Sequence, residues 1–226
     1  METTSATQTI SSHVTEQLKP LLRGWIHLLS APLSFIAALV LLILAPTLPS
    51  RIASAVYLVC SMLLFGMSAA YHRINWTPRA EAVMRRIDHS NIFLLIAGTY
   101  TPICVASLPT RDATVCLSIV WGGAVIGIIT AIFWIHAPRW FTTGIYILLG
   151  WVALWYLPQL WETAGPAIVV LLIVGGVLYT MGAVVYGLKR PDPAPHVFGF
   201  HEIFHTFTVL AWICHCVAAY LAVIGH

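Results

Sequence analysis

The chain has 226 residues, of which 59% are hydrophobic and only 8% are charged, and its mean hydropathy is +0.88. A soluble domain carries about 25% charged residues, so this chain has too little charge to cover a surface that faces water. The formal net charge of +3 comes without any run of Lys or Arg, which excludes a nucleic-acid-binding surface. The composition therefore predicts an all-α, polytopic membrane protein.

The first nineteen residues differ from the rest of the chain in composition. They are rich in Thr and Ser, and they carry Glu2 and Glu16 ahead of the first base, Lys19. A cleaved signal peptide begins with a basic region, so this segment does not have the features of one. We interpret residues 1–19 as a flexible cytoplasmic tail and residues 20–226 as a single membrane domain.

Seven stretches are apolar over about 20 residues, the length that a helix needs to cross a bilayer. They lie at residues 25–45, 52–72, 89–108, 114–135, 141–157, 166–188 and 202–224, and the fifth of them is the shortest. The connections are short and each contains Pro, which breaks helices. The sequence thus predicts a bundle of seven transmembrane helices with no extramembrane domain.

The positions of the bases predict the orientation of the bundle, because cytoplasmic loops are enriched in Lys and Arg. With the N-terminus inside, the cytoplasmic segments hold nine of the eleven bases, and the outer loops hold only Arg51 and Arg111. We therefore expect a cytoplasmic N-terminus and an external C-terminus. The same alternation places the end of the second span and the starts of the third and seventh spans at the cytoplasmic leaflet.

The seventh span begins with His201, Glu202 and His205 in the pattern H-E-x-x-H. Residues four apart project from one helix face, so the two imidazoles can share a zinc ion. His72, at the end of the second span, is predicted at the same depth and is a candidate third ligand. Three imidazoles would leave one tetrahedral position of the ion open for water, as in catalytic zinc sites. The alternative is that these histidines only anchor helix ends in the headgroup region.

Other polar groups lie near this depth. Ser68 shares a helix face with His72, although membrane helices also use serine for helix contacts. Asp88 lies at the predicted start of the third span, where it could equally be an N-cap or a partner of the helix dipole. His215 lies about 15 Å further along the last helix than His205, too far for the same metal shell. We expect it to bond a neighbouring helix.

The remaining candidates have less specific interpretations. His27 and His89 are expected to be interfacial residues at the ends of their spans. No two cysteines form a CxxC pair, so we expect free thiols throughout. The five cysteines are Cys60, Cys104, Cys116, Cys214 and Cys216.

Three blocks of the sequence resemble the hemolysin III group. They are KPLLRGWIHLLSAPLSF, SAAYHRINWTPRAEAVMRRIDHSNIFLLIAGTYTP and FGFHEIFHTFTVLAWICH, and the resemblance runs from about residue 19 to the end. This group is the bacterial arm of the PAQR family (progestin and adipoQ receptors), within a superfamily that includes alkaline ceramidases. The resemblance implies seven helices, a cytoplasmic N-terminus and a location in the bacterial inner membrane.

The resemblance also implies a Zn²⁺ site with the ligands His72, His201 and His205. It matches the family's serine to Ser68, four residues before the first ligand, and the family's water-associated aspartate to Asp88. The carboxylate that activates water is then Asp88 rather than Glu202. One position differs from the adiponectin-receptor branch, which has a tyrosine after this aspartate where this chain has His89. Ligand or substrate preference is therefore not carried over.

Together these residues favour slow zinc-dependent hydrolysis of a lipid amide or ester, or lipid sensing at the same site. Asp88 would accept a proton from water and Ser68 would hydrogen-bond the water or the developing oxyanion. The expected partners are membrane lipids, among them the lipid amide or ester substrate, and no nucleic acid; the sequence does not identify a protein partner.

Three alternatives remain open at the level of sequence. The zinc could be purely structural, tying three spans together in a protein that modulates membrane properties. The H-E-x-x-H pattern could mark an intramembrane metalloprotease with Glu202 as general base. A pore-forming cytolysin is disfavoured, because such proteins are usually secreted in a soluble form first.

Overall fold

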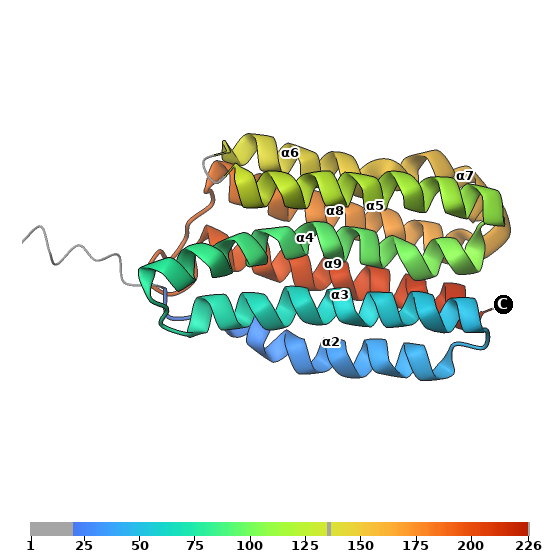
Figure 1. Cartoon of the computed structure of the whole chain (residues 1–226), viewed down its shortest axis with the longest axis horizontal. Helices are drawn as coiled ribbons and strands as arrows, with labels where there is room; N and C mark the ends of the chain where they lie inside the picture. Colours follow the sequence, from blue (N-terminus) through green and yellow to red (C-terminus); the bar gives the residue numbers. More distant parts are fainter. Residues whose placement is uncertain (1–19, 135–136, 226) are drawn as a thin grey trace, which may run out of the picture.

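The computed structural model describes residues 20–134 and 137–225 of the chain, and within these ranges its regular elements are helices. They are α2 (Trp25–Leu44), α3 (Leu48–Arg73), α4 (Pro78–Ser107), α5 (Thr110–Phe133), α6 (Arg139–Gly150), η1 (Trp151–Tyr156), α7 (Leu157–Ala164), α8 (Pro166–Leu188) and α9 (Phe200–Ile224). Figure 1 shows them running side by side along one axis. Residues 1–19, the predicted tail, lie outside the described residues.

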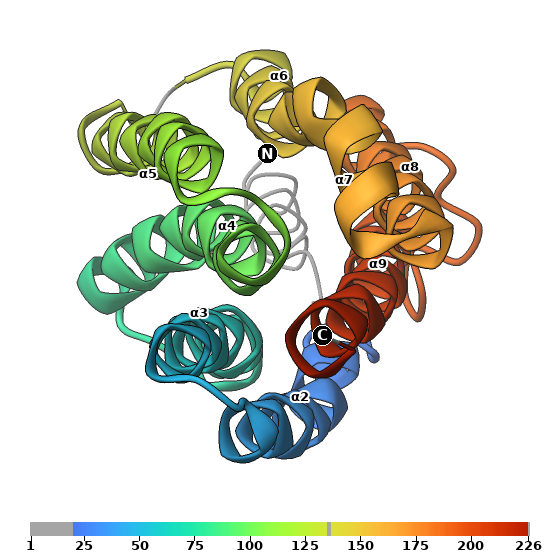
Figure 2. The ribbon, with the colours of Figure 1, turned by 90° about the vertical axis from the view of Figure 1, so that its right-hand side faces the viewer.

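The structure contains seven membrane-spanning units in its described part, which confirms the predicted all-α bundle. Six are single helices, and the fifth consists of α6, η1 and α7 in succession; each unit is long and apolar enough to cross a membrane. Viewed along the axis, the helices form a ring that closes where α2 lies against α9 (Figure 2). An odd number of spans puts the start of α2 and the end of α9 at opposite ends of the bundle (Figure 1).

The side chains are distributed as expected for a protein surrounded by lipid. Large apolar side chains such as Leu33, Ile126 and Trp155 are exposed on the outside of the bundle. Small residues are fully buried where helices meet, and they include Ala38, Ala124, Ala211, Ala218, Ala219 and Ala222. Small side chains let helix backbones approach closely, which is the main source of packing energy in a bilayer. All five cysteines are free, as predicted.

The third span begins earlier than its hydropathy indicates. Helix α4 starts at Pro78 rather than near residue 89, and the Thr77 side chain caps it by accepting a hydrogen bond from the Ala80 N–H. Its first turns carry too many charged residues to score as membrane helix, but Thr followed by Pro is a usual helix start. The interpretation of Asp88 as an N-cap or dipole partner is therefore wrong, because Asp88 lies in the third turn of α4.

The fifth span is longer than predicted and is interrupted. It continues through α7 to Ala164, although residues 158–166 had the features of a connection, and the 3₁₀ segment η1 breaks its regular hydrogen bonding. Tyr100 of α4 supplies the missing partners: its hydroxyl donates to the Gly150 carbonyl at 2.6 Å and accepts from the Ala153 N–H at 2.7 Å. A bilayer offers no water to backbone groups, so such a break needs a partner within the protein.

Candidate metal centre

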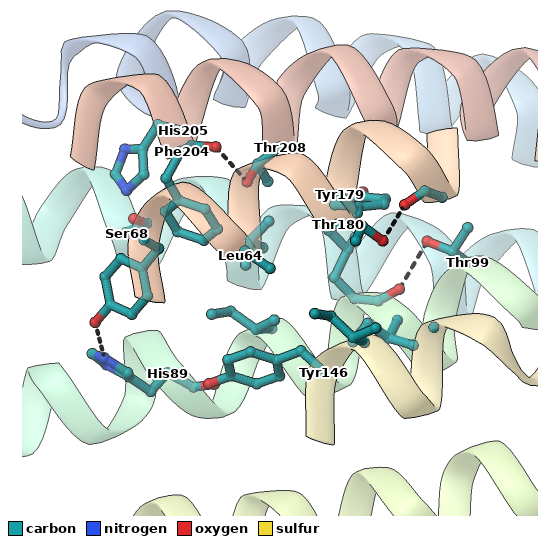
Figure 3. A pocket seen from close by; sticks show the side chains of 18 of the residues that line it. Leu64, Ser68, His89, Thr99, Tyr146, Tyr179, Thr180, Phe204, His205 and Thr208 are labelled. Carbon is teal, nitrogen blue, oxygen red and sulfur yellow. Dashed lines mark hydrogen bonds between the residues drawn. The ribbon is translucent and has the colours of Figure 1, made fainter. Parts of the chain in front are cut away.

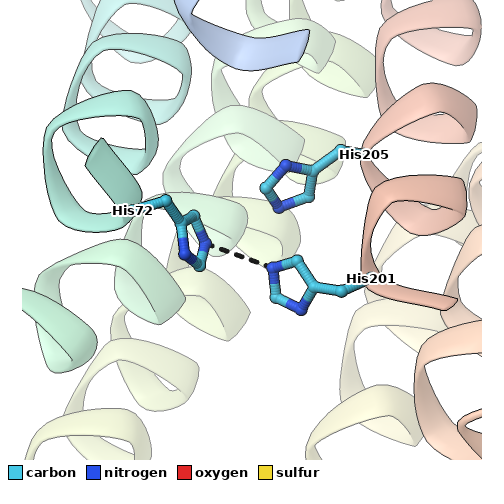
Figure 4. A group of neighbouring side chains, drawn as sticks. All are labelled: His72, His201 and His205. Carbon is cyan, nitrogen blue, oxygen red and sulfur yellow. Dashed lines mark hydrogen bonds between the residues drawn. The ribbon is translucent and has the colours of Figure 1, made fainter. Parts of the chain in front are cut away.

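Three histidines from two helices meet at one end of the bundle (Figure 4). His72 comes from the last turn of α3, and His201 and His205 come from the first two turns of α9. One ring nitrogen of each lies within 4.8 Å of the other two, and the Nε2 atoms of His72 and His201 are 3.1 Å apart. The predicted convergence of these three residues is thus observed.

The start of α9 is fixed by carboxylates, which sets the position of its two histidines. Glu202 accepts a hydrogen bond from the Gly199 N–H at 2.9 Å, and Asp192 accepts one from the Phe200 N–H at 3.0 Å. The other carboxylate oxygen of Glu202 is paired with the Arg23 guanidinium, and the Glu202 side chain is only 1% exposed. The glutamate of the H-E-x-x-H pattern therefore serves the fold at this helix start.

The histidine group has the composition of a metal site, and one pair of its nitrogens has the spacing that two ligands of one ion would have. Zn–N bonds are about 2 Å long, so two nitrogens bound to one ion can lie about 3 Å apart, as those of His72 and His201 do. Imidazole nitrogens are ligands that zinc favours. His72 and His205 are 9% and 3% exposed, which shields their ring nitrogens from bulk water. These three residues can hold a metal ion.

An internal cavity leads away from the histidines. Its walls are mainly aliphatic and aromatic side chains, among them Leu64, Tyr146 and Phe204, and Figure 3 shows these around the space beside His205. Such a lining suits a lipid chain better than a peptide or a sugar.

Both predicted catalytic residues line this cavity at its histidine end. Ser68 is 2% exposed and lies one helical turn before His72. The Asp88 side chain, on α4, lies beside the Ser68 hydroxyl. Residues from α3, α4 and α9 are therefore gathered around one small volume.

Two further histidines, His89 and His27, lie at this end of the bundle; His89 makes contacts through its ring nitrogens, and His27 through its ring face. His89 lines the cavity, where its ring nitrogens contact the Arg85 carbonyl at 2.7 Å and the Tyr186 hydroxyl at 3.2 Å. His27 is not an interfacial residue as predicted, because it is 2% exposed and stacks on His205. The same loop alternation that placed His72 at this depth also places the start of α2 there, but depth alone does not show that the His27 ring turns inward onto His205.

His215 is placed as predicted. Its Nε2 lies 3.2 Å from the Leu172 carbonyl of α8, so it bonds a neighbouring helix. It lines the same cavity at a distance from the three converging histidines.

Comparison with known proteins agrees with this architecture. Residues 15–216 match the model of the family described as Haemolysin-III related. The chain is 34% identical to "Hemolysin-3" of Bacillus cereus over 200 residues, which cover 86% of this chain and 88% of that protein. It is 30% identical to "Hemolysin-3 homolog" of Bacillus subtilis (strain 168) over 186 residues, or 81% and 84% of the two chains.

Proposed function

The chain belongs to the haemolysin-III-related family, and we propose that this multi-pass membrane protein is a zinc-dependent hydrolase of lipid amides or esters. The observation that supports this best is the position of three imidazoles at one end of an apolar cavity inside a membrane bundle. A lipid amide is also the substrate class that kinship with the PAQR family and the alkaline ceramidases would imply. We place the protein in a bacterial inner membrane, with its N-terminus in the cytoplasm.

The proposed zinc ligands are His72, His201 and His205. Zinc held by three imidazoles would supply a Lewis acid and a means of activating water near neutral pH. Because the three rings come from only two helices, the packing of α3 against the start of α9 determines whether the ligand set is complete. The ligand nitrogens are already close together before any ion is considered.

Asp88 and Ser68 have the chemistry and position to accept a proton from water and to stabilise the developing oxyanion, respectively. The Asp88 carboxylate lines the cavity and can accept a proton from water. The Ser68 hydroxyl can donate a hydrogen bond to the carbonyl oxygen of the substrate as negative charge develops on it. Both groups reach the reacting end of a lipid whose chain lies in the apolar part of the cavity.

The position of Glu202 disfavours the metalloprotease alternative. Its two carboxylate oxygens are occupied by Arg23 and by the Gly199 N–H, and it is almost fully buried. A general base must be able to reach a proton on water or substrate. A mainly apolar cavity is also a poor match for an extended peptide, which needs partners for its backbone polar groups.

Replacing Asp88 with Asn separates a hydrolase from a protein in which zinc only ties helices together. Purified wild type and Asp88→Asn are assayed for zinc content and for fatty acid released from ceramide and phospholipid in mixed micelles. We expect the variant to keep its zinc and to lose about 10²- to 10⁴-fold in rate, the usual contribution of a general base. Zinc-loaded wild type that releases no fatty acid, or a variant as fast as wild type, would contradict the proposal.

A further inference from the structure

The start of α2 touches both helices that carry the three converging histidines. Residues 23–27, which we name the leading segment, comprise the two residues before α2 and its first turn, and they contact both α9 and α3. Arg23 pairs with Glu202 of α9. Gly24, in a left-handed conformation with φ of 81°, packs so closely on α3 that an added Cβ would lie 2.7 Å from the His72 Cβ. No residue of this segment belongs to the proposed ligand set.

His27 is the residue of the leading segment that contacts a histidine ring directly. Its ring lies parallel to that of His205, with centroids 3.8 Å apart and an angle of 4° between the planes. The Phe65 ring of α3 packs edge-on against His27, with centroids 5.2 Å apart and planes at 86°. His27 is therefore held between α3 and α9 and presents its flat face to His205.

The contact is made by the ring face and not by a ring nitrogen. In the described part of the chain, neither Nδ1 nor Nε2 of His27 has a hydrogen-bond partner. The three residues whose nitrogens converge are His72, His201 and His205, and His27 is outside that group. A ring stacked flat on His205 points its nitrogens along its own plane, so it is badly oriented to bind the same ion.

A metal-binding histidine is usually oriented by a hydrogen bond from its second ring nitrogen to a carboxylate or carbonyl. Across residues 20–134 and 137–225, the His205 ring contacts other rings, and its nitrogens donate no hydrogen bond to a carboxylate or a carbonyl. The stack with His27 restricts the tilt of the His205 ring plane. In other metal sites a hydrogen bond to the second ring nitrogen has this effect. Tilt decides whether the nitrogen of His205 points at the ion.

We propose that His27 is a positioning residue: the flat face of its ring fixes the His205 ring for metal binding, and the leading segment holds it there. This rests on the metal site proposed above. The role depends on planarity and not on hydrogen bonding. An aromatic hydrocarbon ring should therefore replace His27, whereas an aliphatic side chain of similar size should not.

The test compares His27→Phe with His27→Leu. Both variants remove the ring nitrogens, and only Phe keeps a flat ring. Zinc affinity is measured by competition with a chelator, and unfolding of the chelated protein is measured in the same micelles. Ser34→Ala is the matched control, because Ser34 is a buried polar residue of α2 whose hydroxyl donates to the Ala31 carbonyl, away from the histidines.

We expect His27→Leu to lose roughly 10- to 100-fold in zinc affinity, the usual effect of removing a residue that orients a ligand. His27→Phe and Ser34→Ala should bind zinc as wild type does. The chelated Leu and Phe proteins should unfold alike, so that the loss is specific to metal binding. If His27→Leu does not fold, His27→Met takes its place with the same expectation.

Three results would overturn the proposal. Zinc affinity of the Leu variant equal to that of wild type would show that the stack does not orient His205. Equal losses for Phe and Leu would assign the role to a nitrogen. If the Leu and Met variants both fail to fold while the Phe variant folds, the His27 ring is needed for folding and not for metal binding. Wild type that binds no zinc would refute the proposed function itself, which distinguishes that failure from failure of this inference.

Discussion

Substituting Gly24 with Ala tests whether close packing at the start of α2 maintains the histidine site. Gly24 has φ of 81°, a left-handed conformation that costs a non-glycine residue about 1–2 kcal/mol. The new Cβ would lie 2.7 Å from the His72 Cβ and 3.2 Å from the Arg73 Cγ. Overpacking of this kind costs about 1–3 kcal/mol. The two effects together predict a loss of about 2–5 kcal/mol in the free energy of unfolding.

The substitution should also weaken zinc binding, because relief of the contact moves His72 away from the two histidines of α9. Gly165→Ala is the matched control. Gly165 has φ of 89°, and an added Cβ would meet nothing within 4 Å. It directly precedes α8, and the junction of α7 and α8 lies at the end of the bundle opposite to the start of α9 (Figure 1). This control should lose about 1–3 kcal/mol from backbone strain alone and should keep its zinc affinity.

The assay measures unfolding in micelles without zinc and, separately, zinc affinity by chelator competition. The reasoning predicts that both variants are destabilised and that only Gly24→Ala binds zinc more weakly. Equal zinc affinities for the two variants would refute the inference that this contact positions His72. Unchanged stability of Gly24→Ala would refute the packing itself.

Three further predictions concern other parts of the structure. Glu202→Gln should keep its zinc and lose on the order of 1–3 kcal/mol of stability, because it removes the buried charge that pairs with the partly exposed Arg23. Lost zinc with unchanged stability would contradict this prediction. Tyr100→Phe should destabilise by about 1–3 kcal/mol, since the Ala153 N–H loses its acceptor inside the bilayer, and thermal unfolding in micelles would show no change if the contact were unimportant. Removal of zinc by a chelator should lower the free energy of unfolding of wild type by about 2.7 kcal/mol, compared with protein in a free zinc concentration of 100 times Kd. An unfolding curve that does not depend on zinc would argue against a bound ion.

The main features of the site could be predicted from sequence because they depend on local spacing. His201 and His205 are four residues apart on one helix, so any helix there puts them on one face. His72 follows from counting bases in the loops, which puts the end of the second span at the depth where the seventh begins. The structure brings the three together as these two arguments require.

The parts that could not be predicted depend on contacts between distant segments. The stack of His27 on His205 joins residues of the first and last helices, and hydropathy treats a histidine near a span end as interfacial. The start of α4 at Pro78 was missed because its first turns are charged, although Thr77 and Pro78 carry a helix-start signal. The break in the fifth span is bridged by hydrogen bonds from Tyr100 of α4, a contact between segments about 50 residues apart.

The most direct test of the central claim is the metal content of the purified protein. Wild type is measured beside His72→Ala, His201→Ala and His205→Ala, with His215→Ala as a control that lines the same cavity but bonds the Leu172 carbonyl. The account predicts about one zinc per chain in wild type and in the control, and little or none in the other three variants. Two results would contradict the account. One is a variant that lacks one of the three converging histidines and still holds zinc at the wild-type level. The other is wild type that binds no zinc after purification and reconstitution.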